Sequence, residues 1–358
     1  MKAIVVHPGE RDTIHMRDVP DPRLAADQVA VKVVRLGLCA TDAEINHGSY
    51  GEAPHGSEFL ILGHENFGVI EDVGKKVKAF KPGDRVVSTV RRPCGVCDNC
   101  RHGENDMCSS GRYTERGILR RHGFMAEYYV ESPQWLFKIP RAIEELGVLL
   151  EPMSVVQKAI DHAYGIQRRL RWNPRTALLL GAGPMGLLAA AVLRVRGLEA
   201  HVVGREPASD RRAELARKIG ATYHAVADEP LLDLQRELPP IDLAIEATGA
   251  ASVVFQAMQM LGRNGILCLL SVTAGGESAT EPIAQINHRL VLNSNVVFGS
   301  VNANLRHFSM GIRDMVATQK KYPGVLAQLI TERLPWDQYR SWFSRRGAGI
   351  KTVLELPS

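Results

Sequence analysis

The residues with the clearest chemical potential lie between Gly37 and Gly74. This stretch contains Cys39 and the pair His64-Glu65. A thiol, an imidazole and a carboxylate are ligand types that zinc accepts, and a catalytic zinc site uses about three protein ligands with one position left open. Cysteine is also a common buried apolar residue, and a single histidine is more often structural than a ligand. These residues alone leave both interpretations equally open.

A second group of candidate metal ligands is a cysteine cluster. Four of the six cysteines have the spacing Cys-x2-Cys-x2-Cys-x7-Cys, whereas Cys268 lies in an apolar run and is expected to be a core residue on a strand. Four thiolates from one loop can complete a tetrahedral zinc shell with no open position, which is typical of a structural site. An iron-sulfur cluster uses other spacings, and disulfides are rare in a reducing compartment. The sequence therefore predicts a structural zinc in the loop 94–108, with the ligands Cys94, Cys97, Cys100 and Cys108.

A glycine-rich turn, Gly181-Ala-Gly-Pro-Met-Gly186, follows a short apolar strand and precedes an Ala/Leu-rich helix. Its glycines permit a tight turn and close approach of the backbone to a pyrophosphate, and the helix N-terminus supplies a favourable dipole. The next strand ends at Gly204-Arg205-Glu206, where NAD-binding proteins carry an acidic residue. An arginine suits the 2′-phosphate of NADP, whereas Glu206 would repel it if it pointed inward. The sequence therefore favours NADP over NAD.

The elements that must position these residues fall into two groups. Residues 1 to about 90 predict short strands joined by turns, with loops carrying Cys39 and His64. Pro152 predicts a break followed by a helix, and Glu151 before it is either a solvated helix end, which is slightly favoured, or a carboxylate in a cleft. Beyond Arg175, strands and helices alternate as in a parallel sheet covered by helices. The tail from Phe308 predicts two helices and a last strand.

Composition indicates an ordinary soluble globular protein. The 358 residues, of which 45% are apolar and 23% charged, exceed one typical domain, so two domains are expected. No apolar run approaches the roughly 20 residues that span a bilayer, and no signal-peptide pattern is present, so we expect no membrane association and a cytoplasmic location. The net charge of +5 is mild and its basic residues are dispersed, which argues against nucleic acid binding.

In this order along the chain, the motifs resemble those of the zinc-dependent medium-chain alcohol dehydrogenase family over nearly the whole length. The matching residues are Gly37 to Asp42, Gly63 to Glu65 with Gly68 and Gly74, the cysteine loop and the glycine-rich turn. The resemblance implies an α/β fold. A mostly β GroES-like catalytic domain would span 1–155, a Rossmann domain with a doubly wound parallel sheet 156–300, and a return to the catalytic domain 301–358. It also implies two zinc ions per chain and a homodimer or homotetramer.

Within the family, the chain resembles the glucose (aldose) 1-dehydrogenase branch. The supporting stretches are Tyr50 to Glu65, Val90 to Cys94, Gly123 to Tyr129, Leu150 to Val155 and Ser300 to Asn302. The branch implies oxidation of an aldose, foremost D-glucose, at C1 to the lactone with hydride transfer to NADP, NAD being a possible second cofactor. A polyol, an amino alcohol such as threonine, or a cyclic sugar derivative are alternative substrates. An NADP-binding protein without turnover is the alternative from another class.

The resemblance also implies roles for individual residues. Cys39 and His64 would hold the catalytic zinc together with a carboxylate, and Glu65 and Glu151 both remain open for that position. Thr41 would accept the substrate hydroxyl and relay its proton, with Glu151 as the base. The sugar would lie among Thr41, Glu115, Glu151 and Asn302. The residues implied around the cofactor are Gly181, Gly183, Pro184, Met185, Gly186, Gly204, Arg205, Glu206, Thr248, Ser271, Val301 and Asn302.

Overall fold

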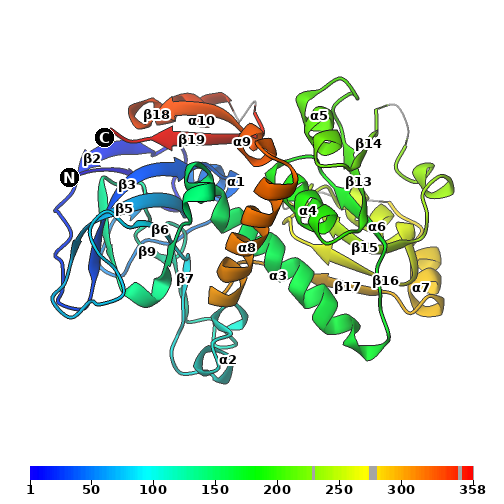
Figure 1. Ribbon diagram of the computed structural model, residues 1–358, viewed down its shortest axis with the longest axis horizontal. Helices are drawn as coiled ribbons and strands as arrows, with labels where there is room; N and C mark the ends of the chain where they lie inside the picture. The colour runs from blue at the N-terminus through cyan, green and yellow to red at the C-terminus, as the bar shows by residue number, and fades with distance from the viewer. Residues whose placement is uncertain (228–229, 274–279, 346–348, 358) are drawn as a thin grey trace. The chain divides into compact units, whose positions relative to one another are not determined.

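The computed structural model describes residues 1–227, 230–273, 280–345 and 349–357, and the chain divides into two compact units. Unit 1 comprises Met1–Ser154, Asn302–Arg313 and Ile330–Ser358, and unit 2 comprises Val155–Val301 and Asp314–Leu329 (Figure 1). Where the sequence placed all of 301–358 with the first domain, the chain instead returns to unit 2 for Asp314–Leu329.

The chain returns to unit 2 within the helix α8 (Leu305–Lys321), which continues across the boundary between the two units at Arg313 and Asp314. In its second half, Asp314 accepts hydrogen bonds from Gln157 at 2.8 Å and from Arg196 at 2.9 Å, and both of these partners belong to unit 2. The helix α9 (Val325–Leu329) follows in the same unit.

Unit 1 is built mainly from strands, as its short β-branched runs predict. Its largest sheet has the order β11-β6-β5-β3-β19-β18, and β10 also pairs with β3. Alternate residues of β3, among them Val29, Val31 and Val33, are buried in the core, which is the period of a strand with one covered face. The bounds are β3 Val29–Gly37, β5 Glu65–Val73, β6 Arg85–Ser88, β10 Tyr128–Glu131, β11 Leu136–Lys138, β18 Ile330–Pro335 and β19 Lys351–Glu355.

The last strand of the chain, β19, lies beside the much earlier β3 (Figure 1). The two strands are antiparallel, with Val353 opposite Gly37. On its other side β3 pairs with β5, which places Gly37 opposite Glu65. Gly37, shortly before Cys39, and Glu65, directly after His64, are therefore held by one sheet that includes the C-terminal strand.

Two small three-stranded sheets and several short helices complete unit 1. The sheets have the orders β2-β1-β4 and β7-β8-β9. Their strands are β1 Lys2–Val6, β2 His15–Asp18, β4 Leu60–Ile61, β7 Arg91–Arg92, β8 Thr114–Arg116 and β9 Arg120–Arg121. The helices are α1 Ala40–Asn46, α2 Asp98–Arg101 and α10 Tyr339–Arg345, and α3 Leu150–Ile166 begins in unit 1 and continues into unit 2.

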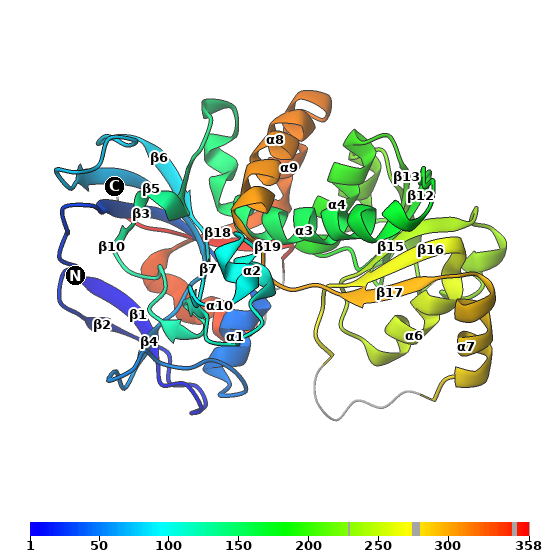
Figure 2. The ribbon, with the colours of Figure 1, turned by 90° about the horizontal axis from the view of Figure 1, so that it is seen from below.

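Unit 2 contains a six-stranded parallel sheet in the order β14-β13-β12-β15-β16-β17, which is the doubly wound Rossmann arrangement. All five residues of β12 are buried because helices cover both faces, with α4 on one side and α6 and α7 on the other (Figure 2). The strands are β12 Thr176–Leu180, β13 Glu199–Gly204, β14 Thr222–Ala225, β15 Ile241–Glu246, β16 Leu261–Leu269 and β17 Val296–Gly299. The helices are α4 Pro184–Val195, α5 Arg211–Lys218, α6 Ala251–Met260 and α7 Ile283–Leu292.

The prediction of a break in the chain's secondary structure at Pro152 was wrong. The helix α3 already begins at Leu150 and continues through the proline. Proline is tolerated in the first turn of a helix, because the missing N–H has no intrahelical acceptor there. The expectation for Cys268 is confirmed, since this residue is fully buried on β16.

Candidate active site and cysteine cluster

Cys39 lies between the end of β3 and the start of α1. Its backbone nitrogen donates a 2.9 Å hydrogen bond to the Asp42 carboxylate, and its Sγ lies 3.9 Å from Thr41 Oγ1. This is a capping box, in which the carboxylate at the third helical position folds back on the residue that starts the helix. The backbone that carries the thiol is therefore fixed by its own helix.

His64 precedes the first residue of β5 and is buried, with 4% of its surface exposed. Its Nδ1 lies 3.4 Å from Oδ1 of Asp42, whose side chain is fully buried. Burial alone would lower the pKa of His64, but the charges and hydrogen bonds of Asp42 and Cys39 together outweigh it and hold the pKa well above its ordinary value. A carboxylate partner of this kind orients an imidazole ring for ligation. Asp42 thus supports both candidate ligands.

The structure brings Cys39, His64 and Glu65 together in unit 1. One potential ligand atom from each residue lies within 4.8 Å of the others, and the histidine and the glutamate are buried. Zinc–ligand distances are about 2.0–2.3 Å, so donors that bind one ion lie up to about twice that distance apart. The donor types and their spacing therefore fit a zinc ion.

Glu65 is also paired with a buried lysine at the start of β19. Lys351 Nζ donates to Glu65 Oε1 at 2.5 Å and contacts Oε2 as well. On the other side, Glu65 lies against the backbone of Gly37, where a Cβ atom would be only 1.9 Å from Oε2. The glycine at this position is required by close approach, because any side chain would displace the carboxylate.

Glu151 lies in the first turn of α3 and is 8% exposed, so it is not the solvated helix end that the sequence slightly favoured. Burial raises its pKa to about 7; the nearby charge of His64 opposes this rise and that of Glu65 adds to it. Glu151 is near the other candidate ligands but is not among the three donors within 4.8 Å of one another.

The four cysteines of the loop 94–108 also lie together, with their sulfur atoms within 4.8 Å of one another. All six cysteines of the chain are free thiols, which excludes the disulfide alternative in this structure. A hydrogen bond from the backbone of Cys100 lowers the pKa of Cys97 to about 5, and the backbone nitrogen of Cys97 donates to Cys94 Sγ at 3.4 Å. Burial raises the pKa of Cys100 to about 12, so the thiols differ, and the feature that fits a closed zinc shell is the convergence of the four sulfurs.

The predicted sugar-binding residues Glu115 and Asn302 are in contact with each other. Glu115 is 3% exposed, and it accepts hydrogen bonds from Asn302 Nδ2 and, at 2.9 Å, from Arg91 Nε. Arg91 stacks on Tyr113, with its guanidinium 3.8 Å from the ring centroid. Asn302 has a φ of +63°, a left-handed conformation that asparagine tolerates better than most residues. Thr41 is half-buried on α1.

The glycine-rich turn has the geometry that its sequence predicts. Gly181 has a φ of +109°, and α4 begins at Pro184 with Gly183 at its N-cap. A Cβ atom at Gly186 would lie 1.8 Å from the Gly181 carbonyl oxygen, so the helix packs directly on the turn. Gly181 also lies against the turn that contains Thr248, whose hydroxyl donates to Glu246 at 2.5 Å.

The candidate phosphate-binding segment follows β13. Arg205 is exposed, whereas the Glu206 carboxylate lies 3.5 Å from the Arg212 guanidinium. The Tyr223 hydroxyl donates to the Glu206 backbone carbonyl at 2.8 Å, which fixes this segment. Of the remaining predicted cofactor residues, Ser271 is half-buried, and Val301 is 63% exposed with its carbonyl accepting from Lys158 at 2.9 Å. The Arg212 guanidinium is shared between Glu206 and Asp210, which also lies 3.5 Å from it, so it offsets part of the charge of Glu206.

Comparison with known proteins places these clusters in a family context. Residues 25–141 match the family described as "Alcohol dehydrogenase GroES-like domain", and residues 144–356 match "Glucose dehydrogenase C-terminus". The chain belongs to the glucose dehydrogenase branch of the medium-chain alcohol dehydrogenases. It is 40% identical to a protein named glucose 1-dehydrogenase from Methanocella arvoryzae over 99% of both chains, and 40% identical to glucose 1-dehydrogenase 1 from Caldivirga maquilingensis over 99% of both.

A solved structure within this family has the same fold. Haloferax mediterranei glucose dehydrogenase, in complex with NADP, zinc and gluconolactone, superimposes with a TM-score of 0.90 at 33% identity over 100% of both chains. The resemblance stated from the motifs and the α/β fold class are therefore confirmed. No helix in the described residues is long and apolar enough to cross a membrane.

Three residues that contact the candidate site residues were given no role from the sequence. Asp42 stood inside a motif without an assigned role, although a carboxylate three residues after Cys39 is a capping-box signal. Arg91 lay within the supporting stretch Val90 to Cys94 but had no assigned role. Lys351 is the first residue of the last strand, shortly before the apolar pair Val353-Leu354, and a charged residue at that place could have indicated a buried partner.

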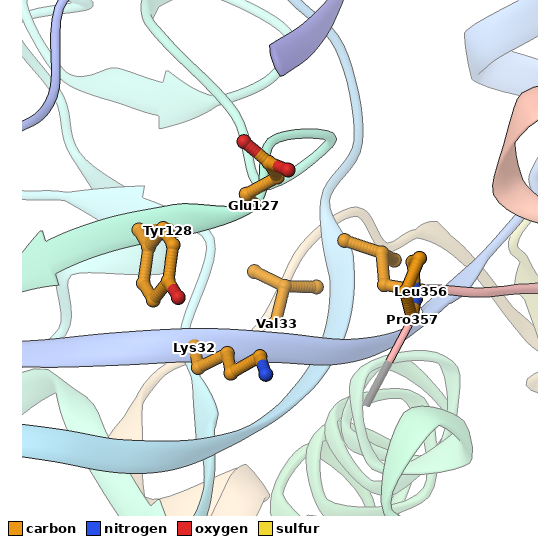
Figure 3. A pocket seen from close by; sticks show the side chains of 6 residues that line it. All are labelled: Lys32, Val33, Glu127, Tyr128, Leu356 and Pro357. Atoms are coloured by element: carbon orange, nitrogen blue, oxygen red, sulfur yellow. The ribbon is translucent and has the colours of Figure 1, made fainter. Parts of the chain in front are cut away.

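A small hollow on unit 1 is unrelated to these residues. It has a volume of about 170 Å³ and is lined by Lys32, Val33, Glu127, Tyr128, Leu356 and Pro357 (Figure 3). None of these residues is a predicted ligand, sugar-binding residue or cofactor-binding residue. The hollow is therefore no candidate for the active site.

Proposed function

We propose that this enzyme oxidises an aldose, foremost D-glucose, at C1 to the lactone with NADP as the hydride acceptor. The observation that carries the proposal is the buried set of thiol, imidazole and carboxylate formed by Cys39, His64 and Glu65. The relatives named glucose 1-dehydrogenase, and the neighbour solved with NADP, zinc and gluconolactone, support the same substrate class.

Two zinc ions per chain are part of this proposal. Cys39, His64 and either Glu65 or Glu151 would hold the catalytic ion, and the four thiols of the loop 94–108 the structural one. Bound in the first set, zinc would act as a Lewis acid that lowers the pKa of the substrate hydroxyl. Elemental analysis of the purified protein should give about two zinc ions per chain.

The chain's own groups provide proton acceptance and sugar binding. The Thr41 hydroxyl, 3.9 Å from the Cys39 sulfur, is placed to accept a hydrogen bond from a hydroxyl held beside that sulfur. Glu151 is the carboxylate that can take the proton. Glu115, oriented by Arg91 and Asn302, retains lone pairs that can accept sugar hydroxyls.

NADP supplies the redox chemistry, and the protein orients it. Arg205 is exposed and is our candidate for binding the 2′-phosphate, and the ion pair between Glu206 and Arg212 reduces the repulsion that Glu206 would exert. NAD remains a second possible cofactor. The variant Arg205→Asp should lower the kcat/KM ratio of NADP to NAD by at least about tenfold, and an unchanged ratio would refute this role.

A polyol, an amino alcohol or a cyclic sugar derivative are the alternative substrates, and binding of NADP without turnover is the alternative from another class. Initial rates with glucose, galactose, xylose, sorbitol and threonine, each with NADP and with NAD, separate them. The proposal predicts the highest kcat/KM for an aldose with NADP. A preference for sorbitol or threonine, or turnover of none of the five, would overturn it.

We further propose that the protein forms a homodimer or a homotetramer through unit 2. The strand β17 ends the sheet, and the neighbouring helix α7 exposes Ile283, Val291 and Leu292, each more than half accessible. An open strand edge beside exposed apolar residues favours pairing with another chain. The mass of Val291→Glu in light scattering should fall below that of the wild type, whereas Val96→Glu, at an exposed residue of unit 1, should leave it unchanged.

The proposed compartment is the cytoplasm, where free thiols such as those of the cysteine loop remain reduced. Fractionation of cells expressing the full chain, followed by immunodetection, tests this assignment. Recovery with secreted proteins would contradict it.

A further inference from the structure

Lys351 places a positive charge inside unit 1, next to the candidate zinc ligands. The side chain is only 4% exposed, and it extends from the first residue of β19. Its ammonium group donates to the Leu38 carbonyl at 2.9 Å and to Glu65 Oε1 at 2.5 Å. These two partners are separated from Lys351 by 313 and 286 residues along the chain.

The two partners of Lys351 adjoin Cys39 and His64, and one of them, Glu65, is itself a candidate ligand. Leu38 precedes Cys39, and Glu65 follows His64. One ammonium group therefore links the segment that carries the thiol to the segment that carries the imidazole. The backbone reinforces this link, because the Leu38 nitrogen donates to the Thr352 carbonyl at 3.1 Å.

A contribution to folding stability does not by itself explain why the charged Lys351 is buried. An apolar side chain of similar volume is often at least as stabilising as a buried ion pair, because two charges must leave water. A lysine ammonium, in contrast, has three donors that can engage several acceptors at once. A charge that bridges two ligand-bearing segments has a role that a packed apolar side chain could not fill.

We propose that Lys351 is a positioning residue for the catalytic zinc. It links the Cys39 and His64 segments so that both ligands are in place before the ion binds. This inference rests on the proposed function, since it needs a zinc ion at that site. The ammonium group contacts Leu38 and Glu65, and its role is exerted through these two residues.

The test is zinc retention, which does not depend on turnover. The variant Lys351→Met removes the ammonium group but keeps the length of the side chain. We expect it to release one of its two zinc ions to a chelator at least about tenfold faster than the wild type. Loss of a residue that supports a metal ligand weakens metal binding by about ten- to a hundredfold, and the expected change is the lower end of that range. Lys351→Arg, which keeps the charge, should restore part of the retention.

Lys158→Met is the matched control. Lys158 is as deeply buried as Lys351, and it also donates to a backbone carbonyl at 2.9 Å, but that carbonyl belongs to Val301 in unit 2. Its loss should leave both release rates within about twofold of the wild type. Equal acceleration in Lys158→Met and Lys351→Met would mean that general loosening, and not positioning, causes the effect.

A second variant covers the case in which Lys351→Met does not fold because Glu65 is left as an unpaired buried charge. Glu65→Gln combined with Lys351→Met removes both charges, and its reference is Glu65→Gln alone, because Glu65 is itself a candidate ligand. The double variant should release one ion faster than Glu65→Gln does. If the variant that folds releases both ions as slowly as its reference, the wild type for Lys351→Met and Glu65→Gln for the double variant, Lys351 has no positioning role. The proposed function fails separately, when the wild type itself holds only one zinc ion or oxidises no aldose.

Discussion

The two clusters of unit 1 are built in opposite ways. The cysteine cluster takes all its donors from one loop, residues 94–108, whose cysteines are half-buried and exchange hydrogen bonds with their own backbone. The set formed by Cys39, His64 and Glu65 takes its donors from two distant segments, and its charges are balanced by Asp42 and Lys351. A loop can supply a full coordination shell by itself, whereas a site that leaves one position open for water or substrate depends on the surrounding fold to hold its few ligands in place.

The largest effect should come from Cys39→Ser, which removes a ligand from the assembled set. We expect the rate of aldose oxidation to fall at least about a hundredfold, which is the upper end of the effect of losing a partner of a metal ligand. The zinc content should fall from about two ions to about one per chain. Steady-state kinetics and elemental analysis on the same sample measure both. Cys268→Ala, at a core cysteine outside both clusters, should retain both ions. Near wild-type turnover with two ions in Cys39→Ser would refute the assignment of Cys39.

Loss of a cysteine from the loop 94–108 should lower the stability of the protein more than its activity. Cys97→Ser opens a cross-link that spans about 15 residues, and losing a covalent cross-link of that length costs about 3 kcal/mol. We expect a comparable fall in the free energy of unfolding, the loss of one zinc ion, and less than a tenfold change in kcat. A modest rise in the KM for sugar is also expected, because Asn304, near Asn302, donates to Glu104 and Asp106 of the loop at 2.9 Å each. Denaturant unfolding and kinetics measure these changes, and a loss of turnover as large as that of Cys39→Ser would erase the distinction between the two clusters.

The same contrast explains what the sequence could predict. The cysteine spacing and the glycine-rich turn are local patterns, and each folds where its own residues place it. Lys351 was missed because its partners lie 286 and 313 residues away, and only strand pairing brings them together. The burial of Glu151 was missed for a related reason, since a carboxylate before a proline has the same local pattern whether the helix start faces water or the protein interior. Family resemblance supplied its proposed role, but not its surroundings.

Substitution of one glycine beside each cluster should have a smaller effect than loss of a ligand, and the first of these glycines is Gly37. A methyl group there would lie 1.9 Å from Glu65 Oε2, so Gly37→Ala should push the carboxylate away from Lys351. Overpacking of this kind costs about 1–3 kcal/mol. We expect a fall of that size in the free energy of unfolding, together with faster release of one zinc ion. Unchanged stability and unchanged zinc release would show that Glu65 can move without consequence.

Gly95, in the cysteine loop, should show the smallest effect. It has a φ of +74°, and a Cβ atom there would meet no atom within 4 Å, so only backbone strain opposes a side chain. Gly95→Ala should therefore cost about 1 kcal/mol and leave turnover unchanged. The control is Gly165→Ala on α3, where a Cβ atom meets no neighbour and φ is ordinary, so that the variant should be stabilised by about 0.5–1 kcal/mol. If Gly95→Ala reduced turnover more than Gly37→Ala, the loop would be the region that controls the chemistry, and the assembled set would not.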